Sequence, residues 1–262
     1  MDNRAIGFFD SGVGGLTILQ ECVSLMPHES MTYIADSANA PYGPKGRKEI
    51  QRLSQQHAQW LLEDKNCKAL VVACNTATTN AIQDLRATYQ VPIIGIEPAI
   101  KPAAISTKTG AIGILATAGT LSSELFSRTS QAYASDINVV EVVGAGLVEY
   151  IESGQLNSPH LKDLLHELIR PMILSDIDHL VLGCTHYPLL IPLLREVLPP
   201  HVDIIDSGAA VARQLQARLT EVDLLASTDA VPQYELYSSS NLAILKFFVP
   251  DLPGCTVSEL PY

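Results

Sequence analysis

The stretch ALVVACNT, residues 69–76, ends an apolar run with a cysteine that two small polar residues follow. The stretch HLVLGCTH, residues 179–186, repeats this arrangement around Cys184. Short apolar runs of this kind are typical of strands buried in a parallel sheet. Ligands of open α/β sheets bind outside the carboxyl ends of the strands, so we expect Cys74 and Cys184 to face one ligand from two sides. Two opposed proton carriers suit the inversion of a carbon centre.

The composition is that of a globular α/β protein, with 47% hydrophobic and 17% charged residues among 262. This length allows one large domain or two small ones. A net charge of -11 and scattered basic residues argue against nucleic acid as a partner. The five cysteines form no CxxC pair, and the sequence has neither a signal-peptide pattern nor an apolar run of about 18 residues. These features predict a cytoplasmic protein with reduced thiols and no membrane contact.

The two cysteine stretches belong to a longer internal repeat. Cys184 lies 110 residues after Cys74, and the strand-like residues 112–114 lie 106 residues after residues 6–8. Loop insertions in one of two copies of a structural unit produce such a small difference in spacing. We therefore expect two pseudo-symmetric α/β lobes with mostly parallel sheets and the active site between them. The alternative is that parallel strands simply look alike. The expected lobes are residues 1–97, rejoined by 215–262, and residues 98–214.

Strands and helices are expected to alternate along both lobes. The expected strands cover residues 6–10, 31–36, 69–74, 92–96, 111–116, 139–143, 180–184 and 202–206. The expected helices cover residues 14–25, 46–63, 147–152 and 161–174, with others that start near 76 and 119 and one that ends near 219. Residues 221–231 indicate a loop, and residues 234–237 and 242–248 indicate a last strand and helix that return to the first lobe.

Polar residues at the predicted strand ends are candidates to meet a ligand. The loop DSGVGG, residues 10–15, exposes backbone N–H groups and places Asp10 at a strand end, although a tight turn alone explains its glycines. Cys74 and Cys184 are either small core residues or reactive thiols, and the polar residues that follow them favour reactive thiols. His186 suits a proton shuttle, a partner for a thiolate, a metal ligand or a half-buried structural histidine.

Four blocks of sequence resemble the bacterial glutamate racemases of the aspartate/glutamate racemase family. They are FDSGVGG (9–15), DSANAPYG (36–43), ACNTA (73–77) and GCTHYP (183–188), in that order. The resemblance extends from Ile6 to about Gly254. It implies a cofactor-independent isomerase that interconverts L-glutamate and D-glutamate and supplies peptidoglycan synthesis for the bacterial cell wall and cell shape. It also implies two pseudo-symmetric lobes with the substrate between them.

The same resemblance implies roles for individual residues. Cys74 and Cys184 would be the opposed catalytic thiols, with Asp10 assisting Cys74 and His186 assisting Cys184. In the family's usual assignment, Cys74 acts on D-glutamate. The substrate-binding residues would be Asp10, Ser11, Tyr42, Gly43, Asn75, Thr76, Thr117, Thr185 and His186. Asp36 and Glu152 are lesser candidates, and Glu152 is placed only through the short match IESG, residues 151–154. No metal ligand and no cofactor are expected.

Three other functions stay open from the sequence. A racemase of aspartate or another acidic amino acid differs from a glutamate racemase by a small change in pocket length. A metal-dependent hydrolase would use Cys74, Cys184, Asp10 and His186 as ligands. A binding protein, such as an inhibitor of a DNA-handling enzyme, would not need the thiols. The sequence does not fix the oligomeric state, and a homodimer is one option.

Overall fold

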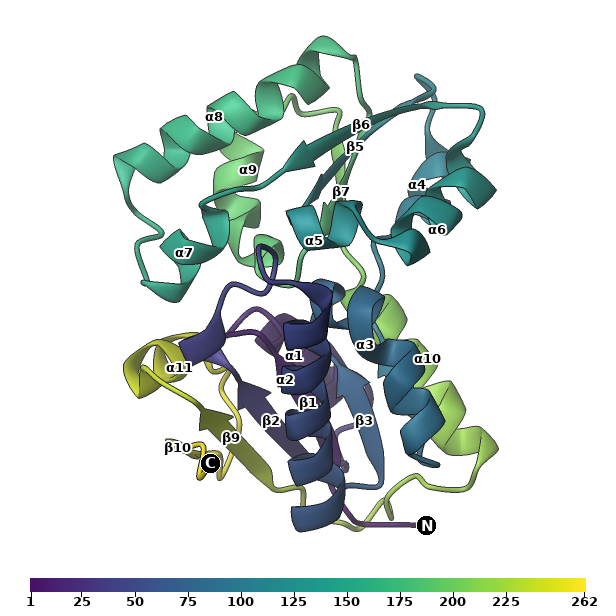
Figure 1. Ribbon diagram of the computed structural model, residues 1–262, viewed down its shortest axis with the longest axis vertical. Coiled ribbons are helices and arrows are strands. Elements are labelled where there is room, and N and C mark those ends of the chain that lie inside the picture. The colour runs from purple at the N-terminus through teal and green to yellow at the C-terminus, as the bar shows by residue number, and fades with distance from the viewer.

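Two parallel sheets form the framework of the computed structural model, which describes residues 1–262 (Figure 1). The six-stranded sheet has the order β10-β9-β2-β1-β3-β4, and the four-stranded sheet has the order β6-β5-β7-β8. All strand pairings are parallel. The strands are β1 (Ile6–Asp10), β2 (Met31–Ala35), β3 (Ala69–Val72), β4 (Ile93–Gly95), β5 (Ala111–Ala116), β6 (Asn138–Val143), β7 (His179–Gly183), β8 (Asp203–Ile205), β9 (Tyr234–Ser238) and β10 (Thr256–Glu259).

The two sheets repeat one arrangement of strands. The order β2-β1-β3-β4 in the first sheet corresponds to β6-β5-β7-β8 in the second. The two strands that precede the cysteines, β3 and β7, each pair with a central strand, β1 or β5. We call the six-stranded sheet with its helices the first lobe and the four-stranded sheet with its helices the second lobe. The predicted fold class, two similar α/β lobes with parallel sheets, is confirmed.

Helices cover both faces of each sheet, which explains why the central strands are apolar on both sides. In β1, Ile6 and Phe8 belong to the core beneath α1 (Leu16–Leu25) and α10 (Gly208–Glu221), whereas Phe9 belongs to the core beneath α2 (Arg47–Gln59) and α3 (Asn75–Thr88). In the second lobe, α8 (Pro159–Leu174) and α9 (Ile191–Val197) cover one face, and α4 (Ile100–Ser106) and α6 (Glu124–Ala134) cover the other (Figure 1). The largest core contains residues of both lobes, including Leu16 of α1 and Leu147 of α7 (Leu147–Glu152).

The helices agree with the prediction in most places, but the single helix expected from about residue 119 is two helices, α5 (Ala118–Leu121) and α6, and two further helices and one strand were not expected. These are α4, α9 and β10. The helix expected over residues 46–63 is an α-helix that continues as a π-helix, η2 (Trp60–Asp64). The helices are α1 (Leu16–Leu25), α2 (Arg47–Gln59), α3 (Asn75–Thr88), α4 (Ile100–Ser106), α5 (Ala118–Leu121), α6 (Glu124–Ala134), α7 (Leu147–Glu152), α8 (Pro159–Leu174), α9 (Ile191–Val197), α10 (Gly208–Glu221) and α11 (Leu242–Phe248), with short 3-10 turns η1 (Ser37–Asn39) and η3 (Tyr187–Leu190).

The chain crosses between the lobes at two neighbouring places. One crossing follows β4, and the other lies between β8 and α10, where the Ser207 hydroxyl donates a hydrogen bond to the Glu97 carbonyl at 2.6 Å. The expected boundary at Gln214 falls inside α10, which packs along α1 of the first lobe. We therefore propose that the second crossing lies near Asp206. None of the helices combines the length and apolar character needed to cross a membrane.

Candidate active site

The carboxyl ends of the central strands of both sheets meet at one small cavity. Both thiols, Cys74 and Cys184, line it. Each is at most 7% exposed. The volume that the centre of a water molecule can occupy in this cavity is about 10 Å³, so the cavity has room for about one water. The lining consists of Ser11, Pro41, Tyr42, Gly43, Cys74, Asn75, Thr76, Thr117, Val148, Cys184, Thr185 and His186.

On the first lobe, the Cys74 thiol lies at the start of α3. Cys74 has an extended backbone and caps the helix, since its Sγ accepts a hydrogen bond from the backbone N–H of Ala77 at 3.4 Å. Its thiol also lies 3.8 Å from the Ser11 hydroxyl. Burial raises the pKa of Cys74 well above its usual value, and the nearby Asp10 carboxylate raises it further. Both effects favour the protonated form of the thiol.

Asp10 ends β1 and lies fully buried behind the cavity. Its two carboxylate oxygens accept hydrogen bonds from the backbone N–H groups of Ser11 and Gly15, both at 2.7 Å. The hydroxyl of Thr185, on the second lobe, donates to the same carboxylate at 3.3 Å. A Cβ atom at Gly15 would lie 2.9 Å from that of Asp10, so only glycine allows this close turn. Burial is the main reason why the pKa of Asp10 is raised.

On the second lobe, Cys184 begins a chain of polar contacts. Its Sγ lies 3.8 Å from Nδ1 of His186, and Nε2 of His186 lies 2.6 Å from the Glu152 carboxylate. Burial lowers the pKa of His186, but its hydrogen bonds to Cys184 and Glu152 outweigh this and hold the pKa well above its usual value. Burial raises the pKa of Glu152, but the hydrogen bond and charge of His186, with the hydrogen bonds from Val13 and Ser37, lower it overall. An imidazole whose pKa is raised thus lies beside Cys184, whereas Asp10 lies near Cys74.

Glu152 also joins the two lobes. It lies at the end of α7 in the second lobe and accepts hydrogen bonds from the Val13 backbone N–H at 2.7 Å and the Ser37 hydroxyl at 2.8 Å, both in the first lobe. Glu152 is not part of the cavity lining and contacts the site through His186. The sequence indicated it only through a short match, because its partners lie far away along the chain.

Hydrogen-bonding groups line the cavity together with the two thiols. The hydroxyls of Thr76, on the first lobe, and Thr117, on the second, are 2.8 Å apart. Thr117 also caps α5 by accepting from the backbone N–H of Thr120. The side chain of Asn75 is 2% exposed, yet neither its amide nitrogen nor its amide oxygen has a hydrogen-bonding partner. Burying an amide without hydrogen-bonding partners costs free energy, and a polar ligand in the cavity would supply the missing hydrogen bonds to Asn75.

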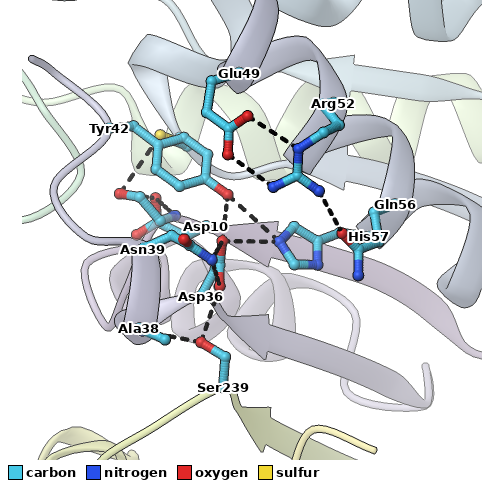
Figure 2. Close-up of polar contacts among 12 residues, drawn as sticks. Asp10, Asp36, Ala38, Asn39, Tyr42, Glu49, Arg52, Gln56, His57 and Ser239 are labelled. Atoms are coloured by element: carbon cyan, nitrogen blue, oxygen red, sulfur yellow. Dashed lines mark hydrogen bonds and ion pairs between the residues drawn. The ribbon is translucent and has the colours of Figure 1, made fainter. Parts of the chain in front are cut away.

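The loop after β2 forms the remaining wall of the cavity, and Asp36 supports it from behind. Pro41, Tyr42 and Gly43 line the cavity, whereas Asp36 lies behind them and accepts a hydrogen bond from the Tyr42 hydroxyl at 2.6 Å (Figure 2). Burial raises the pKa of Asp36, but its hydrogen bond with His57 contributes to an overall lowering. Val148 and His57 were not singled out from the sequence, since a valine and a helical histidine carry no local signal of a site.

The side chains that a metal-dependent hydrolase would use as ligands are not grouped around one point in this structure. The proposed ligands Cys74, Cys184, Asp10 and His186 do not form a metal-binding group, and no three His, Cys, Asp or Glu side chains elsewhere do so. Asp10 instead accepts backbone N–H groups, and His186 pairs with Glu152. This arrangement does not favour the metal-hydrolase alternative.

Comparisons with known proteins point to one family. The model of the Asp/Glu/Hydantoin racemase family matches residues 16–215. A glutamate racemase from Pseudomonas entomophila is 47% identical over 94% of this chain and 93% of its own length. The structure of a Francisella tularensis glutamate racemase in complex with D-glutamate has a TM-score of 0.83, 29% identity and 98% coverage of both chains. An Escherichia coli glutamate racemase in complex with L-glutamate and an activator, UDP-MurNAc-Ala, has a TM-score of 0.84, 31% identity and the same coverage.

Proposed function

We propose that this chain, which belongs to the Asp/Glu/Hydantoin racemase family, interconverts L-glutamate and D-glutamate without a cofactor. One observation carries the proposal: Cys74 and Cys184, from equivalent positions of two similar lobes, line the same cavity. The names of the relatives support glutamate as the substrate, and two related structures contain its two enantiomers. The free cysteines support a reducing, cytoplasmic location.

The proposed reaction transfers one proton from each side of the substrate. A thiolate on one face takes the Cα proton, and the Cα–H electron pair stays on the substrate as a carbanion. The thiol on the other face then gives its proton to that carbon, so the configuration inverts and the two sulfurs exchange protonation states. The sulfurs return to their first state by exchange of protons with their neighbours, Asp10 for Cys74 and His186 for Cys184.

The carbanion is the costly species, and the site must stabilise it. Hydrogen-bond donors around the substrate carboxylate typically contribute a factor of about 10² to 10³ each. Asn75, Thr76 and Thr117 are suited to this task because they line the cavity together with the thiols and the Asn75 amide has no other partner. Nδ1 of His186, whose pKa is raised, lies 3.8 Å from Sγ of Cys184, so His186 is placed to exchange a proton with this sulfur. Closure of the lobes excludes water that would quench the intermediate.

Aspartate is the nearest alternative substrate. It is shorter by one methylene, and such a difference changes binding in a pocket by about 1 to 3 kcal/mol. The curated relatives at 44% to 48% identity are named glutamate racemases, which favours glutamate. The proposed product, D-glutamate, is a building block of peptidoglycan, so the enzyme would supply cell-wall synthesis.

The test mixes the purified protein with L-glutamate, D-glutamate or either enantiomer of aspartate, without added cofactor. Circular dichroism then follows the optical activity of the amino acid over time. Both glutamate enantiomers should lose their signal and reach the same end point, whereas aspartate should react at least tenfold more slowly. Cys74→Ser and Cys184→Ser should each abolish racemisation, while Cys22→Ser, a buried cysteine of α1 outside the cavity, should keep it. A stable signal with glutamate, or full activity in either cavity variant, would contradict the proposal.

A further inference from the structure

The cavity wall made by Tyr42 and Gly43 is anchored from behind by one carboxylate. Asp36 accepts the Tyr42 hydroxyl at 2.6 Å, the Asn39 amide at 3.0 Å and the Ser239 hydroxyl at 2.9 Å (Figure 2). These partners come from the loop after β2, from η1 and from the segment after β9. Asp36 therefore joins the loop after β2, which contains η1, to the segment after β9, behind the wall made by Tyr42 and Gly43.

His57 of α2 is the fourth partner of Asp36. Its side chain is 3% exposed, and Nε2 lies 3.0 Å from the Asp36 carboxylate and 3.4 Å from the Tyr42 hydroxyl. Because the Tyr42 hydroxyl already donates to Asp36, a proton on Nε2 of His57 allows both groups to donate to the same carboxylate. The other ring nitrogen is then free to accept a hydrogen bond.

Tyr262 provides the hydrogen bond for that second nitrogen. Its hydroxyl lies 2.9 Å from Nδ1 of His57. Its ring packs against Trp60 with the centroids 5.6 Å apart, and Trp60 in turn meets Tyr237 edge-on at 4.9 Å. A continuous chain of polar contacts thus runs from Tyr262 through His57 and Asp36 to Tyr42, and every ring nitrogen and hydroxyl in it has a partner.

We propose that His57 and Tyr262 are positioning residues of this active site, which act through Asp36 to hold the backbone of Tyr42 and Gly43 against the substrate. The identity of the substrate rests on the proposed function, but the anchoring of the wall does not. Neither residue lines the cavity. Of the polar contacts made by the Asp36 carboxylate, only the one with His57 comes from α2. Loss of His57 therefore removes the connection between Asp36 and this helix.

Two substitutions of His57 separate its two contacts. Glutamine places an amide nitrogen near the position of Nε2 and can still donate to Asp36, whereas asparagine reaches only as far as Nδ1. We expect His57→Gln to keep the KM for glutamate within about threefold of the wild type, and His57→Asn to raise it about tenfold with a smaller change in kcat. A loss confined to KM identifies binding that is equal in the ground state and the transition state. Equal kinetics of the two variants would overturn the proposal.

The contribution of Tyr262 is tested by removing its hydroxyl alone. Tyr262→Phe keeps the packing on Trp60 and should raise the KM about two- to fivefold without a change in melting temperature. The matched control is Tyr89→Phe, because the Tyr89 hydroxyl also contacts α2, where it accepts from Gln55 at 2.8 Å, but has no connection to Asp36. The proposal for Tyr262 fails if both variants have the kinetics of the wild type.

A second measurement does not depend on the substrate. Tyr42 and Cys74 pack in the same apolar core, so a loosened Tyr42 should expose the Cys74 thiol. The alkylation of Cys74 by iodoacetamide can be followed by mass spectrometry. We expect it to be at least fivefold faster in His57→Asn than in His57→Gln or the wild type. Equal alkylation rates would overturn the anchoring role even if glutamate is racemised. A faster rate in a protein that does not racemise glutamate would contradict the proposed function alone.

Discussion

His186 is the residue whose charge distinguishes the two sides of the site. It lies between the Cys184 thiol and the Glu152 carboxylate, and these hydrogen bonds overcome the burial that would otherwise lower its pKa. On the other side, burial and Asp10 raise the pKa of Cys74. The two thiols thus lie in different surroundings, Cys74 near the buried Asp10 and Cys184 beside an imidazole whose pKa is raised. This asymmetry suits the proposed two-thiol reaction, in which one sulfur gives a proton while the other takes one.

Glu152→Gln tests the charge on His186. The change removes a group that raises the pKa of His186, so the imidazolium should lose its proton at a lower pH than in the wild type. The alkaline limb of kcat/KM should move to lower pH. A hydrogen bond to a charged group contributes about 1.5 to 3 kcal/mol, so kcat/KM at pH 8 should fall about 10- to 100-fold.

The control for this variant is Glu149→Gln, an exposed residue of the same helix with the same change of charge. Its pH profile should match that of the wild type. An alkaline limb of Glu152→Gln that stays in place or moves to higher pH would contradict the assigned role of Glu152.

The candidate residues that the sequence indicated most directly lie where a strand ends. Asp10 is the last residue of β1, Cys184 follows β7, and Cys74 lies two residues after β3, where the topology of a parallel sheet brings side chains together. Glu152 and His57 could not be predicted in this way. Glu152 meets a histidine 34 residues away, and His57 meets Tyr262 across 205 residues, so only the folded chain reveals their partners.

At the scale of single elements, β7 of the second lobe is fixed at its start by Asp178. This carboxylate accepts hydrogen bonds from the Thr107 hydroxyl at 2.7 Å and the Thr109 backbone N–H at 3.1 Å, and it lies 2.7 Å from Nδ1 of His179. Burial raises the pKa of Asp178, but these hydrogen bonds lower it below its usual value. Asp178 thus joins the turn before β5 to β7.

Asp178→Asn should destabilise the protein by about 2 kcal/mol at pH 7, because the hydrogen bonds to a charged acceptor are lost. The folded-state pKa of Asp178 is lowered, so its contribution is present above the unfolded pKa of about 3.9 and is lost as the pH falls through the folded value. Urea unfolding at several pH values should therefore show a difference between wild type and variant that shrinks below about pH 4. The exposed Asp176→Asn, at a positive φ of 54° that asparagine tolerates, is the control. A difference that grows at acidic pH would contradict this role.

Elements were predictable where burial imposes a pattern. The central strands are buried on both faces and appear as continuous apolar runs. The three unexpected elements lack such a pattern: α4 contains Pro102, α9 begins with a proline at its second position, and β10 is an edge strand with largely exposed side chains. Their structure follows from contacts with neighbouring elements rather than from their own residues.

At the scale of the whole molecule, the two lobes touch across the cavity. A Cβ atom at Gly119 of α5 would lie 2.9 Å from the Gly43 carbonyl oxygen and 3.0 Å from Cγ2 of Thr76, both in the first lobe. The hydrogen bond between Thr76 and Thr117 spans the same gap. Because the closed cavity has room for about one water, the lobes must separate to admit a substrate and then close again.

Gly119→Ala should hinder this closure, because the added methyl group meets the backbone of the opposite lobe. The KM for glutamate should rise at least tenfold, while the melting temperature changes by only a few degrees since each lobe keeps its own core. Gly46→Ala is the matched control, as its Cβ atom would meet nothing within 4 Å. Unchanged kinetics in Gly119→Ala would show that close contact at α5 is not needed.

The most direct test of two opposed thiols is exchange of the Cα proton in D₂O, followed by NMR with each pure enantiomer of glutamate. Cys74→Ser and Cys184→Ser each retain one thiol, which can remove and return a proton only on the face it meets. Each variant should therefore incorporate deuterium into one enantiomer without inverting it, and the two variants should select opposite enantiomers. Exchange of the same enantiomer by both variants, or inversion by either, would contradict the account.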